Sequence, residues 1–464
     1  MLEPRAAGRA VPALLGICVL VALVGALFLR SGPPASAPTR AGPPNLVLLV
    51  LDTLRADHVG AYGGALPPGV SPELDAFAAE GVRFARAIAP SSWTRPSMGS
   101  LFTSRHPRTL GLYVEDGDAL RDEFTTLAEA LQAGGYRTLG LTANPNLNRA
   151  FNFQQGFDVY VEGWRWLEPG AGPGPERRAP LPTAPELFER ALALAAEEAA
   201  RPTCLFIQVM EIHEHHRPDA LLRPENRDAF AGHPDAAYLA SIQQLSHDVG
   251  AFVEALGGLP GWEDTLVLIT SDHGEGLRNH PHVAKSSFHG RLLYDSQNWV
   301  PLVLWATHGA RLPRGRVVEQ RVRLLDLMPT LLDYAAAEPP EGMVGVSLRP
   351  LVDGAETLPA LPELFVVETQ FRGTDKLGVY GERFKLVHNR VPHEGTAPFE
   401  LQQNGAAEDG LRTDAGERHP AERERLRTHL EAWAAEHPRV PAWRSGTELT
   451  EEEREQLRAI GYVP

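Results

Sequence analysis

The chain has 464 residues, 43% of them apolar, which is enough for a large core and for more than one domain. Its 44 basic and 59 acidic side chains give a formal charge of −15, and the chain shows no cluster of Lys and Arg, so nucleic acid is excluded as an expected partner. The two cysteines provide no disulfide framework, and a small anionic substrate held by a metal remains compatible with this composition.

The N-terminus predicts a membrane anchor, residues 1–29. Two arginines precede an uncharged, mostly apolar stretch at residues 10–29, about the length of a helix that crosses a bilayer. Only Arg30 follows directly, so the rest of the chain is expected outside the cytoplasm, in the bacterial periplasm or at the cell surface. The alternative is a cleaved signal at Ala35-Ser36-Ala37, which would give a secreted protein, although Pro38 directly after this site is unfavourable for cleavage.

Residues 30–44 are rich in Pro, Ala, Ser and Gly and predict an extended linker. The globular part is expected to begin at Asn45. We divide it into a catalytic domain, residues 45–341, and a C-terminal subdomain, residues 342–464.

Strand-like and helix-like segments alternate through the first of these domains. Residues 46–51 form a continuous apolar run, as expected for a strand that is buried on both faces. Further strands are predicted at 137–142, 204–210, 265–270 and 301–305, and helices from Ser71 to Gly81 and at 126–133, 184–200, 238–256 and 325–336. This alternation predicts an α/β fold with a mostly parallel central sheet and helices on both of its faces.

The pattern changes after about Gly342. Strand-like runs at 365–369, 377–380 and 384–388 follow one another without helices between them. They predict a small antiparallel sheet, which a charged helix at about 421–436 follows. The tail 451–460 is a further helix, for which Thr450 and Glu453 have the spacing of a capping box. The C-terminal subdomain is therefore expected to be of the α+β class.

Residues that suit a metal follow two of the predicted strands. Asp52 comes after the first strand, and Asp272 and His273 come after the strand at 265–270. Open α/β sheets bind their ligands at the carboxyl ends of the strands. Each residue alone can be a helix cap or an ordinary loop residue, but two carboxylates and an imidazole together suit one divalent metal ion. Calcium, zinc, manganese and magnesium all remain open.

Thr94 is a candidate nucleophile. Pro96 suits the first turn of a helix, which places Thr94 at the helix N-terminus, where backbone N–H groups favour an anion. A hydroxyl in this position beside a metal can attack a tetrahedral anionic ester. The alternative is that Thr94 or Ser92 simply caps the helix.

An ordered series of motifs runs along the globular part. The motifs are PNLVLLVLDTLRADH at 44–58, GVRF at 81–84, SDHGE at 271–275, HG at 289–290, LYD at 293–295, VPL at 300–302, DLMPTLL at 326–332, GVSL at 345–348 and LRAIGYV at 457–463. In this order they resemble the sulfatase family, within the alkaline-phosphatase superfamily. The resemblance covers nearly the whole globular part and implies an alkaline-phosphatase-like fold and an ester hydrolase.

Carried over by position, the resemblance implies that Asp52, Asp272 and His273 bind the metal. Thr94 would be both a metal ligand and the nucleophile. By resemblance to relatives with an unmodified Thr or Ser, the Thr94 oxygen would attack phosphorus or sulfur in line, and water or an acceptor alcohol would resolve the covalent intermediate.

Three more residues are candidates for catalysis or binding. The resemblance implies that His289 binds the metal or protonates the leaving group, and that His213 faces the substrate. Arg95 lies next to the nucleophile and is expected to clamp the anion, although it can also face solvent.

The chain departs from the sulfatase pattern at several positions. Sulfatases carry Cys/Ser-x-Pro-x-Arg and oxidise the Cys or Ser to formylglycine, whereas Thr94 and Met98 stand at the two ends of this segment here. Threonine has a secondary alcohol, so its oxidation would give a ketone rather than an aldehyde, and the formylglycine route is expected to be closed. Thr53 replaces a second metal Asp, and Asn144-Pro145-Asn146 replaces a Lys-Trp-His segment.

Three functions remain open from the sequence. The first is a metal-dependent hydrolase of sulfate or phosphate esters that acts outside the cytoplasm with a Thr nucleophile. The second is an envelope transferase of phosphoryl-linked headgroups, although such relatives usually carry several membrane spans. The third is a catalytically silent binding protein of the same fold. The expected partners are an anionic ester and, through the N-terminal helix, the membrane.

Overall fold

The computed structural model describes residues 42–113, 117–166, 181–198, 200–279, 287–307, 312–391, 396–404, 414–447 and 449–460. The predicted anchor, residues 1–29, and the linker up to residue 41 lie outside these ranges. Gly42–Pro464 belongs to one compact unit. In the part of the chain that is described, none of the helices is both long and apolar enough to span a bilayer.

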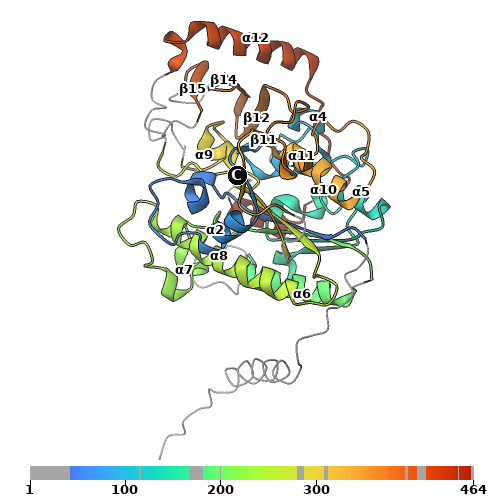
Figure 1. Ribbon diagram of the computed structural model, residues 1–464. Coiled ribbons are helices and arrows are strands. Elements are labelled where there is room, and N and C mark those ends of the chain that lie inside the picture. The colour runs from blue at the N-terminus through green and yellow to red at the C-terminus, as the bar shows by residue number, and fades with distance from the viewer. Residues whose placement is uncertain are drawn as a thin grey trace, which may run out of the picture. The chain divides into compact units, whose positions relative to one another are not determined.

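A mostly parallel sheet forms the centre of this unit, as predicted (Figure 1). The order of its eight described strands is β10-β2-β9-β7-β1-β6-β4-β5. Their bounds are β1 Asn45–Leu51, β2 Val82–Phe84, β4 Arg137–Thr142, β5 Val159–Glu162, β6 Thr203–Val209, β7 Thr265–Thr270, β9 Leu302–Ala306 and β10 Arg316–Val318. Strand β1 lies between β6 and β7 and is parallel to both. All of its residues are buried, which explains its unbroken apolar sequence.

Strand β9 is the main exception to the parallel order. It pairs antiparallel with β7, with Ile269 opposite Val303. The predicted strand at 301–305 therefore exists, but its direction is reversed relative to its neighbour. The neighbouring strand β2 and the edge strand β10 beyond it were not predicted, because three residues are too few to show an alternating or continuous apolar pattern.

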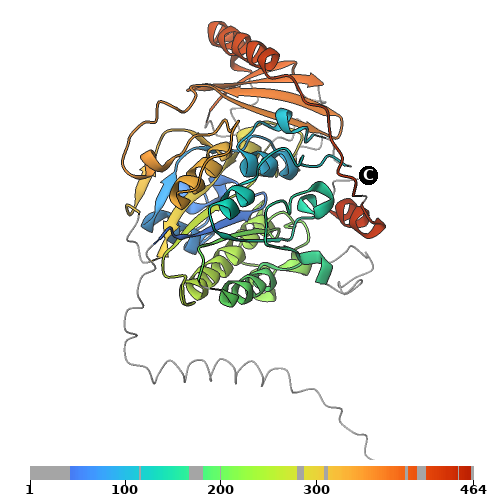
Figure 2. The same ribbon diagram turned by 90° about the vertical axis from the view of Figure 1, so that its right-hand side faces the viewer.

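Helices cover both faces of the sheet, as expected (Figure 2). One group packs together as α2 (Pro72–Glu80), α6 (Ala184–Glu197) and α8 (Ala236–Gly257), and another as α3 (Thr94–Thr103), α5 (Leu127–Ala133) and α10 (Leu327–Ala335). The described residues also form the short helices α4 Pro107–Leu110, α7 Pro218–Leu221, α9 Asp295–Asn298 and α11 Arg349–Val352. The Ser71 side chain makes no capping bond to α2, because its hydroxyl is bonded to Gly60 N and Asp75 instead.

The C-terminal part contains the expected antiparallel sheet, in the order β12-β13-β14-β15. These strands are β12 Phe365–Phe371, β13 Thr374–Tyr380, β14 Phe384–Val391 and β15 Phe399–Gln403. Helix α12 (Pro420–Glu436) lies across this sheet and buries Leu426 and Leu430 against it (Figure 1). Helix α13 (Glu451–Ala459) begins with the predicted capping box of Thr450 and Glu453.

Buried polar contacts join the antiparallel sheet to the first part of the chain. Arg108 of α4 forms an ion pair with Glu368 of β12, with 3.1 Å between Nε and Oε2. The backbone N–H of Glu368 donates to the carbonyl oxygen of Pro90, at 3.0 Å, and so holds the segment that leads to α3. A third small sheet, β11-β3-β8, lies in the same chain (β3 Ala87–Ile88, β8 Trp299–Val300, β11 Val322–Arg323). The domain boundary at residue 342 stays a prediction.

Candidate active site

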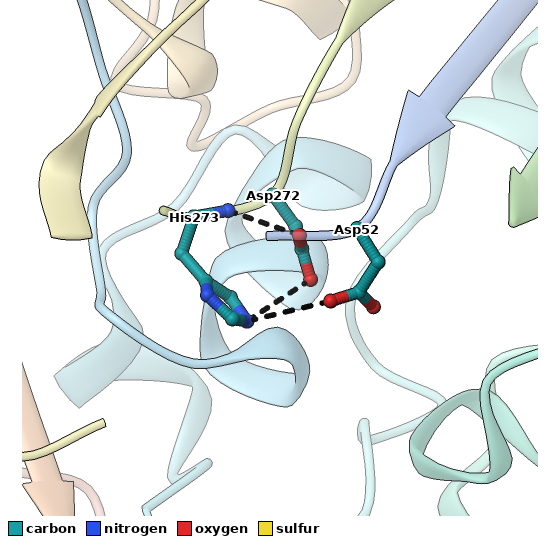
Figure 3. A group of neighbouring side chains, drawn as sticks. All are labelled: Asp52, Asp272 and His273. Carbon is teal, nitrogen blue, oxygen red and sulfur yellow. Dashed lines mark hydrogen bonds and ion pairs between the residues drawn. The ribbon is translucent and has the colours of Figure 1, made fainter. Parts of the chain in front are cut away.

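Asp52, Asp272 and His273 meet at the carboxyl edge of the central sheet. Asp52 follows β1, and the other two follow β7, its parallel neighbour. Figure 3 shows the two carboxylates and the imidazole pointing toward one another. One ligand atom from each residue lies within 4.8 Å of the others, and all three residues are buried. His273 Nε2 is 3.4 Å from Asp272 Oδ2 and 3.9 Å from Asp52 Oδ1.

Local hydrogen bonds orient the side chains of Asp272 and His273. His273 Nδ1 is 2.9 Å from the carbonyl oxygen of Gly274, so Nδ1 carries the hydrogen and Nε2 presents its lone pair to the carboxylates. Asp272 Oδ1 accepts from the backbone N–H groups of His273, at 3.0 Å, and of Thr53, at 3.4 Å. The other oxygen of Asp272, Oδ2, therefore faces His273.

Two amide side chains hold Asp52. Asn144 Nδ2 donates to Asp52 Oδ2 at 2.6 Å, and Gln208 Nε2 donates to the same oxygen at 2.9 Å. Asp52 Oδ1 is fully buried and has no hydrogen-bond partner among the described residues. A buried carboxylate oxygen without a donor is costly unless a cation faces it.

These observations fit a divalent metal ion. The donor set combines two carboxylates with an imidazole whose lone pair is directed at them. Burial and the charge of Asp272 raise the pKa of Asp52 to about 7 in the protein alone. A bound cation would offset both effects and keep the carboxylate ionised.

Thr94 is the first residue of α3, and Pro96 lies in the first turn, as expected. Its hydroxyl oxygen is 3.3 Å from His273 Nε2 and accepts a hydrogen bond from Asn144 Nδ2 at 3.2 Å. The N-cap of the helix is Trp93, which makes no side-chain capping bond, so the alternative that Thr94 or Ser92 caps the helix does not apply. Ser97 Oγ donates to the carbonyl oxygen of Asp272, at 2.6 Å, and ties the helix to the triad.

His213 and His289 join the same cluster. The ring of His289 lies 4.5 Å from the ring of His273 and 5.1 Å from the ring of His213, measured between centroids. Each is held through Nδ1 by a buried glutamate. The distances are 2.9 Å from His213 to Glu214 and 3.1 Å from His289 to Glu275.

The two histidines differ in charge. Burial opposes the charge of His213, but the hydrogen bond to Glu214 and the charge of Asp52 raise its pKa to about 9. Burial lowers the pKa of His289 to about 4, and the attraction of Glu275 does not overcome it. At neutral pH the protein alone therefore presents one protonated and one neutral imidazole to the same space.

Arg95 is fully buried rather than exposed to solvent. Its guanidinium carbon lies 3.5 Å from the centre of the Phe151 ring, and Nη2 donates to Asn146 Oδ1 at 3.1 Å. The anion clamp at Arg95 stays a prediction. Met98, four residues after Thr94, is part of the apolar core.

The sequence reasoning missed two side chains that contact the candidate ligands. Gln208 lies inside β6, where its neighbours predict only a core strand, and no motif distinguishes it. Asn144 was noted only as a departure from the sulfatase pattern. Both are polar residues near the carboxyl end of a strand, Gln208 in β6 beside β1 and Asn144 after β4 beside β6, and that position would have been the available signal.

Comparison with known proteins identifies the family. The sulfatase family model matches residues 44–337, and the model for the C-terminal part of N-sulphoglucosamine sulphohydrolase matches residues 285–430. Arylsulfatase A of Bos taurus is 28% identical over 367 residues, which cover 69% of each chain. Delta 4,5-hexuronate-2-O-sulfatase of Bacteroides thetaiotaomicron is 25% identical over 434 residues, which cover 81% of this chain and 84% of that protein.

A solved structure supports the fold. The phosphonate monoester hydrolase of Agrobacterium radiobacter superposes with a TM-score of 0.68 at 21% identity and covers 88% of this chain and 98% of its own. The fold, the ordered motifs and the match over residues 44–337 lead to one conclusion. The chain belongs to the sulfatase family of the alkaline-phosphatase-like superfamily and is an ester hydrolase of that family.

Proposed function

We propose that the protein is a metal-dependent hydrolase of sulfate or phosphate esters, with Thr94 as its nucleophile, that acts outside the cytoplasm. The observation that carries this proposal is the position of the Thr94 hydroxyl. Its oxygen lies 3.3 Å from His273 Nε2, at the start of α3 and beside Asp52 and Asp272. The apolar stretch at residues 10–29 supports the location.

In this mechanism Thr94 Oγ1 attacks the sulfur or phosphorus atom. A bond forms between that atom and Oγ1, the bond to the ester oxygen breaks, and the alcohol leaves. We assign the proton for the departing oxygen to protonated His213, in place of His289 as the resemblance implied, and we assign the proton that Thr94 loses to neutral His289. Water then attacks the same atom and the bond to Thr94 Oγ1 breaks. One proton of the water restores the Thr94 hydroxyl, the other leaves with the released hydrogen sulfate or hydrogen phosphate, and His289 returns its proton to His213.

Asp52, Asp272, His273 and Thr94 would hold the divalent ion, which would polarise the ester oxygens and the nucleophile. A pocket of about 440 Å³ supports a place for the organic part of the ester, because its lining includes close sequence neighbours of His213 and His289. His215, Tyr238, Leu277 and Phe288 are among its lining residues. Tyr238 connects pocket and site, because its hydroxyl donates to the carbonyl oxygen of Thr53 at 2.7 Å.

The test is an assay of the full chain in detergent with an aryl sulfate, an aryl phosphate monoester and an aryl phosphodiester. Each is measured after removal of metal and after addition of Mn²⁺, Zn²⁺, Ca²⁺ or Mg²⁺. We expect Thr94→Ala to reduce turnover by about 10³-fold or more, since the nucleophile is lost. A quenched reaction should also leave a sulfo or phospho group on the peptide that contains Thr94, detected by mass spectrometry.

Thr103→Ala, at the other end of α3, is the matched control. Thr103 is equally buried, and among the described residues its hydroxyl donates only to the carbonyl oxygen of Gly99 in the same helix, at 2.7 Å. Turnover of Thr94→Ala equal to that of Thr103→Ala would overturn the mechanism. Headgroup transfer in lipid extracts without hydrolysis would favour the transferase, and no activity on any ester would favour the silent protein. Protease accessibility in intact cells tests the location.

A further inference from the structure

Asn144 occupies a position that the proposed mechanism leaves without a role. It follows β4 and caps the short helix Pro145–Leu147, where its Oδ1 accepts from the backbone N–H of Asn146 at 2.9 Å. The side chain of Asn146 donates to the same oxygen at 3.2 Å. Since these donors identify Oδ1, the amide nitrogen of Asn144 must be the atom that faces the site.

That nitrogen contacts two of the proposed active residues. It donates to Asp52 Oδ2 at 2.6 Å and to Thr94 Oγ1 at 3.2 Å, so both of its hydrogens are used. One amide group therefore joins the candidate nucleophile to a candidate metal ligand. Asn144 is fully buried, which removes competition from bulk water.

Gln208 completes the arrangement on the other side of Asp52. Its Nε2 donates to Asp52 Oδ2 at 2.9 Å and lies 3.5 Å from Asp272 Oδ2. Both amides thus bind the same oxygen of Asp52, and the other oxygen, Oδ1, is turned toward His273. Hydrogen bonds of this kind orient the ligands of metal sites in proteins.

We propose that Asn144 is a positioning residue that holds the Thr94 hydroxyl and the Asp52 carboxylate in one fixed arrangement. This inference rests on the proposed function, in which Thr94 is the nucleophile. Asn144 sets the direction of the Thr94 oxygen by donating to it, and sets which oxygen of Asp52 is available to the cation. It does so as a neutral donor, where the sulfatase pattern has a lysine.

Asn144→Ser separates this role from folding. Serine also caps short helices, so its hydroxyl can replace Oδ1 at the backbone N–H of Asn146, but it is too short to reach Thr94 and Asp52. Asn148→Ser is the matched control, because Asn148 is equally buried and caps the next short helix, Arg149–Phe151, through the N–H of Ala150. Both variants make the same chemical change in the same loop.

We expect Asn144→Ser to lower kcat by about 100-fold with a smaller change in KM, and to weaken the binding of Mn²⁺ to the metal-free protein by about 10-fold or more. Mn²⁺ binding is measured by calorimetry. Asn148→Ser should leave both quantities within about threefold. In a Thr94→Ala background, Asn144→Ser should cause no further loss of turnover but should still weaken Mn²⁺ binding.

The outcomes separate this inference from the proposed function. If Thr94→Ala keeps normal turnover, the proposed function is wrong. If Thr94→Ala abolishes turnover while Asn144→Ser behaves like Asn148→Ser in both kcat and Mn²⁺ affinity, only the inference on Asn144 is wrong. Recovery of Mn²⁺ affinity in Asn144→Gln, which restores an amide donor, would support the positioning role.

Discussion

Gly290 directly follows His289, a candidate catalytic residue, and packs against β12 of the C-terminal sheet. Replacing Gly290 by alanine tests whether this contact stabilises the protein and positions His289. The φ angle of Gly290 is +87°, in the left-handed region that favours glycine. A Cβ atom on Gly290 would lie 2.6 Å and 2.7 Å from two ring atoms of Phe371 at the end of β12. The carbonyl oxygen of Gly290 also accepts a hydrogen bond from Thr369, at 2.7 Å.

Two effects lower the free energy of unfolding in Gly290→Ala. The left-handed backbone costs about 1–2 kcal/mol for an alanine. Overpacking in a close-packed region costs about 1–3 kcal/mol more. The Phe371 ring cannot simply move away, because it packs against Trp93 with 5.4 Å between ring centroids. We therefore expect the free energy of unfolding to fall by about 2–5 kcal/mol.

We expect the kcat of ester hydrolysis to fall in Gly290→Ala as well. His289 precedes Gly290 directly, and its ring lies 6.5 Å from that of Phe371. A shift of the loop by about 1 Å would misplace this imidazole and reduce kcat by about 100-fold. Urea unfolding followed by tryptophan fluorescence gives the stability, and ester turnover gives kcat.

Gly373→Ala is the control, and Phe371→Leu completes the test. Gly373 also has a positive φ, +78°, but nothing lies within 4 Å of its added Cβ, so only the backbone cost of about 1–2 kcal/mol applies. The double variant Gly290→Ala with Phe371→Leu should lose less free energy of unfolding than the sum of the losses of the two single variants. The expected difference is about 1–3 kcal/mol. Strict additivity, or equal costs for Gly290→Ala and Gly373→Ala, would refute the steric argument.

Three further predictions concern the metal, an ion pair and pH. Chelation of divalent metal should abolish the binding of an ester to the Thr94→Ala protein, measured by calorimetry, and surviving affinity would contradict the metal-centred site. Glu368→Leu alone should destabilise the protein by about 3–5 kcal/mol in urea unfolding because it leaves Arg108 buried without its ion-pair partner, whereas the pair Glu368→Leu with Arg108→Met should recover most of that loss. Burial lowers the pKa of His106 to about 3, from about 6.5 in the unfolded chain. Between these two values the unfolded chain binds the proton and the folded protein does not, so the free energy of unfolding falls as the pH falls from about 6.5 to about 3. His106→Asn should flatten the curve of stability against pH in that window, by up to about 1.4 kcal/mol per pH unit, and an unchanged curve would rule out this assignment.

The elements that were predicted best are those with strong local signals. Strands β4 and β7 match their predicted bounds because apolar runs end at polar residues that turn the chain. Asp52, Asp272 and His273 were found because a general rule relates the carboxyl ends of parallel strands to ligand sites. Strand β15 was missed, since its polar residues resemble a loop until they pair with β14.

The amides around Asp52 show why part of the site could not be predicted. Gln208 is separated from Asp52 by 156 residues and Asn144 by 92, so their contacts depend on the order of the strands in the sheet. That order, with β6 between β1 and β4, does not follow from the order of the strands along the chain. Local patterns predicted the strands β1, β4 and β6 themselves, but only the topology identifies which of their polar side chains meet.

The strand order places the neutral side chain of Asn144 beside Thr94, and this affects how an acidic protein would attract an anionic ester. The net charge of −15 repels such a substrate at long range, so local groups must supply the attraction. Asn144 adds no charge beside Thr94, where the sulfatase pattern has a lysine. In the proposed mechanism the attraction would come mainly from a metal ion held by the triad, with His213 as a second positive group. Ester affinity should therefore depend on the metal more steeply for a phosphate monoester with two negative charges than for a sulfate ester with one.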